Sequence, residues 1–169
     1  MIELILGGAR SGKSAYAQQQ ATASKQNVIY IATATGDDQE MQLRIRRHQQ
    51  ERPSHWQVIE EPIALAQTLK NYASTDTCLL VDCLTLWLSN LLGLDDEDRL
   101  QLEIAQLYDV VQELPGTVLL VSNETGLGII PMGELTRRYC DEAGLLHQKL
   151  AALSDSVIFM LAGLPQKIK

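Results

Sequence analysis

The segment GGARSGKS, residues 7–14, has the residue types and spacing of a loop that binds phosphate. It matches the pattern G-x-x-x-x-G-K-[ST], follows an apolar run typical of a strand, and precedes a helical pattern. This context disfavours the alternative of a strand-to-helix turn that merely contains glycine. Backbone N–H groups of such a loop surround the phosphates, Lys13 reaches the β- and γ-phosphates, and the Ser14 hydroxyl can hold Mg²⁺.

Asp82 ends the apolar run CLLVD and is the expected carboxylate partner for the same metal ion. In phosphate-loop enzymes this carboxylate follows a second buried strand. The alternative role is an N-cap for the helical pattern that begins at residue 84, because Asp is common before helices. One residue can serve both purposes, so both interpretations stay open.

The stretch RRHQQERPSHW is a basic segment in an acidic chain and holds two of the three histidines. If residues 38–52 are helical, Arg44, His48 and Arg52 share one face, and Pro53 ends the helix. Guanidinium groups bind phosphate oxygens in pairs, and their charge favours a neutral imidazole that can attack phosphorus. From spacing alone, a solvated charged helix face is the alternative.

The other candidate groups have less specific interpretations. His55 is expected to pack against Trp56 in a loop, and His147, in a long helical pattern, is expected to be structural. A metal site that joins His48 and His55 is disfavoured by the proline between them and by their cationic neighbours. Glu124, in SNETG, is a candidate general base, with a loop-stabilising hydrogen bond as the equal alternative.

Short apolar runs alternate with helical patterns along the whole chain. Strands are expected at 2–6, 27–32, 78–82, 117–122 and 156–162, with a further short strand at 56–60. Helices are expected at 13–24, 38–51, 63–73, 84–92, 97–114 and 134–153. Nearly continuous apolar strands separated by helices predict an α/β fold with a mostly parallel sheet and helices on both faces.

Composition narrows the class of protein further. A chain of 169 residues, 46% hydrophobic and with only short breaks between elements, predicts a single domain over residues 1–169. Its net charge of -7 opposes nucleic-acid binding, and no apolar window approaches the roughly 20 residues of a membrane span. Cys78, Cys83 and Cys140 lack disulfide or zinc spacing, so we expect three buried thiols and a cytoplasmic location.

Longer motifs also follow one another in a fixed order: GGARSGKS, IATAT, RIRRHQQERPSHW with EEP, VDCLTLWLSNLL, VSNETGLGIIP, RRYCDEAG and LAGLPQKIK. Together they resemble the bifunctional adenosylcobinamide kinases and adenosylcobinamide-phosphate guanylyltransferases of cobalamin biosynthesis, over nearly the whole chain. The H-x-x-x-R-P-x-x-W and SNE-x-G-x-GI-x-P elements are not general features of P-loop proteins. The resemblance implies a P-loop NTPase fold related to the RecA-like core and a homotrimer.

The resemblance implies two reactions. In the first, the γ-phosphate of ATP or GTP moves to the hydroxyl of the aminopropanol arm of adenosylcobinamide. In the second, GTP transfers GMP to an enzyme histidine with release of pyrophosphate, and GMP then passes to adenosylcobinamide phosphate, giving adenosyl-GDP-cobinamide. Two alternatives stay open: a guanylyltransferase without the kinase activity, and a nucleotide-dependent binding or regulatory module.

Motif and resemblance together define the expected site. The histidine before the R-P-x-x-W element is His48, which the resemblance makes the guanylylated residue, and Lys13 is the second catalytic residue. Ser14 and Asp82 are the expected Mg²⁺ ligands. The expected nucleotide-binding residues are Gly7, Gly8, Ala9, Arg10, Ser11, Gly12, Lys13, Ser14, Ala32, Thr33, Ala34, Gln49, Gln50, Glu51, Arg52, Glu60 and Asp82.

Three positions depart from the pattern of the family that the chain resembles. Val58 stands where many relatives have threonine, and Cys140 stands where an arginine is frequent. His147 stands where asparagine is common. None of these positions lies in the phosphate loop or at His48.

Overall fold

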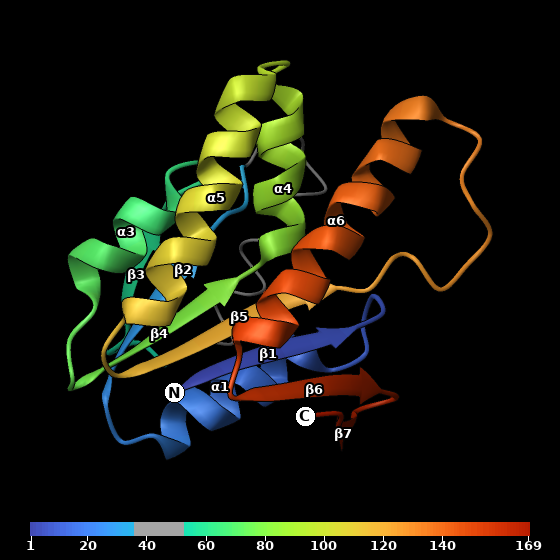
Figure 1. Cartoon of the computed structure of the whole chain (residues 1–169). Helices are drawn as coiled ribbons and strands as arrows, with labels where there is room; N and C mark the ends of the chain where they lie inside the picture. The colour runs from blue at the N-terminus through green and yellow to red at the C-terminus, as the bar shows by residue number, and fades with distance from the viewer. Residues whose placement is uncertain (36–52) are drawn as a thin grey trace.

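The computed structural model describes residues 1–35 and 53–169, which form one seven-stranded sheet with helices on both faces (Figure 1). The strand order is β3-β2-β4-β5-β1-β6-β7, and every neighbouring pair is parallel except β6 and β7. The strands are β1 (Ile2–Gly7), β2 (Asn27–Ala32), β3 (Gln57–Glu60), β4 (Thr77–Asp82), β5 (Thr117–Asn123), β6 (Ser156–Leu161) and β7 (Leu164–Lys167). The predicted class and six predicted strands are confirmed.

Four helices cover one face of the sheet and α1 covers the other (Figure 1). The helices are α1 (Lys13–Ala23), α3 (Leu65–Tyr72), α4 (Leu84–Gly93), α5 (Glu97–Glu113) and α6 (Glu134–Leu153). The helix expected at 38–51 lies outside the described residues. None of the helices in the described ranges combines the length and apolar character needed to cross a bilayer.

Local side chains explain where two of these helices begin. Helix α3 starts at Leu65 rather than at residue 63, because the Glu61 carboxylate accepts hydrogen bonds from the N–H groups of Ile63 and Ala64 at 2.9 and 2.7 Å. Helix α5 starts after Asp96, whose side chain accepts from the N–H of Arg99 at 3.0 Å. Capping of this kind satisfies N–H groups that have no partner within the helix.

The sheet separates two apolar cores. Between the sheet and the four helices lie Leu100, Ile104, Leu107 and Val111 of α5, together with the fully buried Trp87 of α4. The indole N–H of Trp87 donates to the carbonyl of Ile63 at 2.7 Å, so this large ring is buried without an unpaired donor. Under α1, the small side chains of Ala17 and Ala21 allow the helix to approach the sheet closely.

Strand β7 was not predicted, because its sequence LPQK has neither apolar alternation nor a continuous apolar run. It pairs antiparallel with β6 through a two-residue turn in which Ala162 and Gly163 both have positive φ, 52° and 82°. Two such residues are typical of a tight hairpin. The N–H of Gly163 donates to the carbonyl of Ser11 at 2.9 Å, so this hairpin supports the phosphate loop.

Candidate functional site

The carboxyl ends of the parallel strands lie along one edge of the sheet. Strand register places Gly7 beside Asn123, and Ala32 beside both Asp82 and Glu60. Open α/β sheets bind ligands at this edge, because loops that leave adjacent strands meet there. The structure therefore places the phosphate loop, Asp82, residues 32–34 and Glu60 along this edge, with β2, β4 and β5 between Glu60 and the loop.

The phosphate loop connects β1 to α1 in a conformation that requires glycine at two positions. Gly7 has a φ of 149°, and a Cβ there would lie 2.5 Å from the carbonyl oxygen of Met160. Gly12, the N-cap of α1, has a φ of 98° in the left-handed region. These conformations leave the backbone N–H groups of the loop at the start of α1, as an anion site needs.

Lys13 is almost fully buried, although it carries a charge. Its Nζ donates to the carbonyl of Gly8 at 2.6 Å, within the loop itself. Burial lowers the pKa of Lys13, and the neighbouring Cys83 and Asp82 oppose this shift. A buried ammonium is stabilised by a nearby phosphate, which would add a second anionic partner to Asp82.

Asp82 is held from the α1 side of the sheet. The hydroxyl of Tyr30 donates to Asp82 Oδ2 at 2.9 Å, which orients the carboxylate at the end of β4. The alternative role as an N-cap is wrong: the N-cap of α4 is Cys83, and no side chain caps this helix.

The two oxygen donors predicted as metal ligands would suit Mg²⁺ better than a transition metal. The carboxylate of Asp82 ends β4, and the hydroxyl of Ser14 belongs to the first turn of α1, which packs on the same face. Outside residues 36–52, no group of three or more His, Cys, Asp and Glu side chains is placed to hold a metal ion. Mg²⁺ typically takes one or two protein ligands and completes its shell with phosphates and water, so this donor set fits it.

Thr33 connects β2 to the start of α4. The residue is fully buried, and its Oγ1 accepts from the N–H of Cys83 at 2.9 Å and donates to the Cys83 carbonyl at 2.7 Å. The side chain of Asn90 donates to the carbonyl of Thr33 at 2.8 Å. The hydroxyl and the carbonyl of Thr33 are thus both engaged within the protein, so these two groups hold β2 against the start of α4.

A buried polar cluster, which we call the β5–α6 cluster, consists of Thr85, Ser122, Glu124 and His147. Ser122 Oγ lies 2.8 Å from His147 Nε2 and 3.5 Å from Thr85 Oγ1, and Glu124 Oε2 lies 3.6 Å from His147 Nδ1. Burial lowers the pKa of His147, while the charge of Glu124 opposes this. The sequence analysis expected His147 to be structural and did not predict this cluster. The spacing of His147 from the buried apolar residues of α6 was the one sequence feature that indicated a buried imidazole.

Other expected residues divide between the described and undescribed parts of the chain. Arg44, His48 and the residues 49–52 lie outside the described residues. Glu60 is exposed at the end of β3, on the edge that carries the phosphate loop. His55 is exposed in the turn before β3, and the adjacent Trp56 is buried in the core under α1.

The cysteine prediction is correct for one thiol. Cys78 is buried in β4, whereas Cys83 and Cys140 are only partly buried, and all three are free. The expectation of three buried thiols is therefore wrong for two of them, because both lie near the carboxyl edge, where the sheet and its helices are open. Burial raises the pKa of Cys83 to about 11, so this thiol stays protonated beside Asp82.

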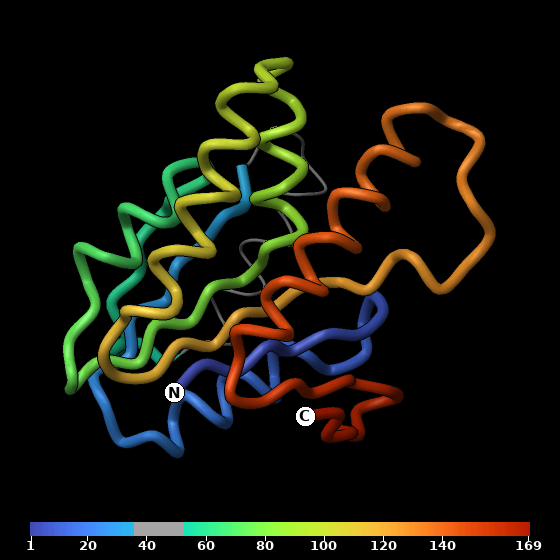
Figure 2. The backbone as a smooth tube through the Cα atoms, viewed as in Figure 1, coloured from blue at the N-terminus to red at the C-terminus, as the bar shows by residue number. Residues whose placement is uncertain are grey.

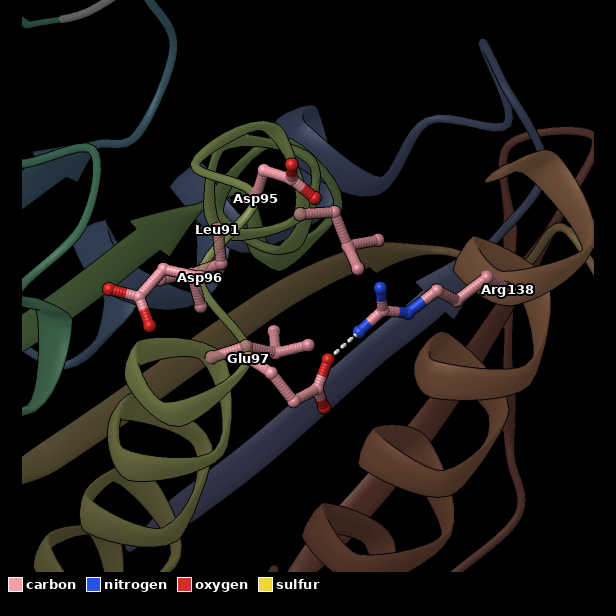
Figure 3. Close-up of a pocket in the computed structure, with 7 residues that line it drawn as sticks. Leu91, Asp95, Asp96, Glu97 and Arg138 are labelled. Atoms are coloured by element: carbon pink, nitrogen blue, oxygen red, sulfur yellow. Dashed lines mark hydrogen bonds and ion pairs between the residues drawn. The ribbon is translucent and has the colours of Figure 1, made fainter. Parts of the chain in front are cut away.

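A small pocket lies between the turn that joins α4 to α5 and the side of α6 (Figure 3). Its volume is about 80 Å³, well below the roughly 300 Å³ at which ligand pockets begin. An ion pair between Arg138 and Glu97 crosses it, and none of its lining residues belongs to the predicted site. We do not assign it a ligand.

The buried His147 predicts a pH dependence of stability. Its folded pKa is below that of the unfolded chain, so below about pH 6.5 the unfolded chain binds a proton that the folded chain does not. The free energy of unfolding should therefore fall as the pH falls through this value. Denaturant unfolding at a series of pH values measures the slope, which His147→Asn should reduce. His55→Asn is the control at an exposed position and should keep the wild-type slope; an unchanged slope in His147→Asn would contradict the assignment.

Comparison with known proteins identifies the family of the chain. A family model described as "Cobinamide kinase / cobinamide phosphate guanyltransferase" matches residues 3–168. "Bifunctional adenosylcobalamin biosynthesis protein CobP" of Pseudomonas aeruginosa is 56% identical over 169 residues, covering 100% of this chain and 98% of the relative. "Bifunctional adenosylcobalamin biosynthesis protein CobU" of Escherichia coli is 37% identical over 182 residues, covering 100% of this chain and 100% of the relative.

Two solved structures share the fold at low sequence identity. The RadB recombinase has a TM-score of 0.55 at 15% identity, with 94% of this chain and 73% of that chain covered. The flagellar accessory protein FlaH from Methanocaldococcus jannaschii has a TM-score of 0.53 at 14% identity, with 99% of this chain and 77% of that chain covered. These likenesses confirm the predicted P-loop α/β fold and nothing beyond it. On the match over residues 3–168 and the full-length relatives, the chain belongs to the cobinamide kinase / cobinamide phosphate guanyltransferase family.

Proposed function

We propose that this chain phosphorylates the aminopropanol hydroxyl of adenosylcobinamide with ATP or GTP, and then transfers GMP from GTP to adenosylcobinamide phosphate. The products are adenosyl-GDP-cobinamide and pyrophosphate. One observation carries the proposal: a chain that belongs to this family along its length also has a formed phosphate loop, with the buried Lys13 beside Asp82. The alternatives of a guanylyltransferase alone and of a nucleotide-dependent binding module are outcomes of the experiments below.

For the kinase step, the phosphate loop holds the nucleoside triphosphate, and the hydroxyl of the aminopropanol arm attacks the γ-phosphorus of that nucleotide. The N–H groups of residues 7–14 bind phosphate oxygens, and Lys13 neutralises charge that builds up on the β- and γ-phosphates. Ser14 and Asp82 would hold Mg²⁺, which neutralises the triphosphate when bound. Tyr30 contributes by holding the carboxylate of Asp82 in one orientation.

For the guanylyl transfer, His48 is the proposed nucleophile. Its imidazole attacks the α-phosphorus of GTP and forms a P–N bond, while the bond to the bridging oxygen breaks and pyrophosphate leaves. The phosphate oxygen of adenosylcobinamide phosphate then attacks the same phosphorus and frees His48. Two displacements through a covalent intermediate allow two anionic substrates to react in turn. The residues 49–52 and Glu60 are the proposed further contacts of the nucleotide.

We also propose that the chain forms a homotrimer in the cytoplasm. The loop between β5 and α6 extends away from the sheet (Figure 2) and exposes large apolar side chains, which favours their burial against another chain. These side chains are Leu127, Ile129, Ile130 and Met132, and Leu135 in the first turn of α6 is exposed beside them. Three free thiols are compatible with a reducing compartment.

The nucleophile is tested by covalent labelling. The protein is incubated with Mg²⁺ and GTP labelled at the α- or the γ-phosphate and then denatured. We expect acid-labile, base-stable label from the α-phosphate only, and none in His48→Ala, because a phosphoramidate requires the imidazole. His55→Ala is the matched control and should label normally. Label that persists in His48→Ala, or none in the wild type, would contradict the assignment.

The role of the phosphate loop is tested at Lys13. Lys13→Ala should lower phosphorylation of adenosylcobinamide by ATP about 100-fold or more, because it removes the cation that stabilises the transferring phosphate. Lys25→Ala changes the same residue type in the exposed turn that follows α1 and should keep wild-type rates. The rates are measured by separation of phosphorylated and unphosphorylated corrinoid. Full activity of Lys13→Ala in both reactions would refute the proposed role of the loop.

A further inference from the structure

The β5–α6 cluster lies directly behind the carboxyl edge and has no role in the reactions as described so far. Ser122 and His147 are more than nine-tenths buried, between α4, β5 and α6. Glu124, the first residue after β5, closes the cluster on the solvent side, and its side chain is 20% exposed. A buried row of hydroxyl and imidazole groups that ends at a partly exposed carboxylate is costly unless every group is paired.

One assignment of donors lets the hydrogen bonds of the cluster run in a single direction. The N–H of Asn123 donates to Thr85 Oγ1 at 2.7 Å, so the Thr85 hydroxyl can donate to Ser122. In this assignment Ser122 donates to Nε2 of His147, and the proton of the neutral imidazole is on Nδ1, facing Glu124 Oε2. The other tautomer would turn the Nδ1 lone pair toward a carboxylate, which is unfavourable.

Glu124 also contacts the phosphate loop. Its N–H donates to the carbonyl of Gly7 at 3.0 Å, and its Oε1 accepts from the N–H of Gly126 at 2.5 Å. These bonds hold the residue next to the loop that binds the γ-phosphate. The distance of 3.6 Å from His147 Nδ1 to Oε2 is longer than a hydrogen bond, and a shift of a few tenths of an ångström would form one.

Two carboxylates of the edge, those of Asp82 and Glu124, lie on opposite sides of the sheet. Asp82 bonds to Tyr30 on the α1 side, whereas Glu124 faces His147 of α6 on the other side. Asp82 is therefore placed with Ser14, the other proposed metal ligand. Glu124 remains for a different task at the same edge.

We propose that Glu124 is the general base of the kinase step and that His147 is a positioning residue that orients its carboxylate through Nδ1–H. This inference rests on the proposed kinase activity. The corrinoid hydroxyl oxygen forms a bond to the γ-phosphorus, and the bond from that phosphorus to the bridging oxygen breaks, its electron pair leaving with the nucleoside diphosphate. The hydroxyl proton passes to Glu124 and is lost to water after the products leave.

The proposal separates the two activities. Formation of the guanylyl-histidine and transfer of GMP to a phosphate oxygen involve no hydroxyl proton, so neither needs this base. Loss of Glu124 should therefore slow the kinase step and leave covalent labelling by α-labelled GTP intact. A merely structural role would lower both activities together, because both depend on the same loop.

The first test is Glu124→Gln, which keeps an oxygen for the Gly126 N–H but cannot take up the proton. We expect kcat for phosphorylation to fall about 100-fold or more, while KM for ATP and the extent of guanylylation stay near wild type. Unchanged phosphorylation, or an equal fall in both activities, would overturn the inference. A wild-type protein that cannot phosphorylate adenosylcobinamide would instead contradict the proposed function itself.

The second test compares two amides at residue 147. His147→Asn places an N–H near the Nδ1 position and should keep kinase kcat within a few-fold of wild type. His147→Gln places its amide near the Nε2 position, toward Ser122, and should lower kcat about tenfold without a matching loss of guanylylation. Equal kinase rates in the two variants, or a greater loss in His147→Asn, would refute the positioning role.

A spectroscopic measurement tests the direction of the cluster without any enzyme assay. With only three histidines in the chain, His48→Ala and His55→Ala assign the nitrogen NMR signals of His147. The geometry requires the Nδ1–H tautomer at neutral pH. An Nε2–H tautomer would contradict the proposed orientation of Glu124.

Discussion

Parallel hydrogen bonding of β1, β5 and β4 brings the ends of three strands, far apart in sequence, to one edge of the sheet. Gly7 begins the phosphate loop there, Asp82 ends β4, and Glu124 follows β5. The two apolar cores hold this register, since a slip of one residue would exchange the faces of every side chain in a strand. The chemistry proposed for the chain depends on that alignment more than on any single contact.

Charge is concentrated at this edge although the surrounding protein is apolar. Burial lowers the pKa of Lys13, and the neighbouring Asp82 partly opposes this shift. A nucleotide triphosphate would supply a further anionic partner, so binding energy and catalysis would use the same buried cation. Asp82 and Glu124 lie on opposite sides of the sheet, which keeps the proposed metal ligand and the proposed proton acceptor apart.

The sequence predicted the features that depend on local pattern. The phosphate loop, the apolar strands and the amphipathic helices could be read directly, because each has a characteristic period or motif. Strand β7 could not be predicted, because the residues LPQK have no apolar pattern and the strand forms only by pairing with β6 across a tight turn. The partners of His147 and the Thr33 contacts with Cys83 were equally hidden, since they join residues that only the folded sheet brings together. The sequence allowed two roles for Asp82, a metal ligand or the N-cap of α4. The structure excludes the N-cap role, because Cys83 is the residue at the N-cap position of α4.

The proposed function requires that one phosphate loop holds the nucleotide both for transfer of the γ-phosphate and for transfer of GMP. The most direct measurement is inhibition of both reactions by a non-hydrolysable ATP analogue, with phosphorylation and guanylylation followed in the same protein preparation. A single shared loop predicts that the analogue competes with the nucleotide in both reactions and does so with the same inhibition constant. Guanylylation that continues unaffected at analogue concentrations that stop phosphorylation would show two separate nucleotide sites and contradict the account.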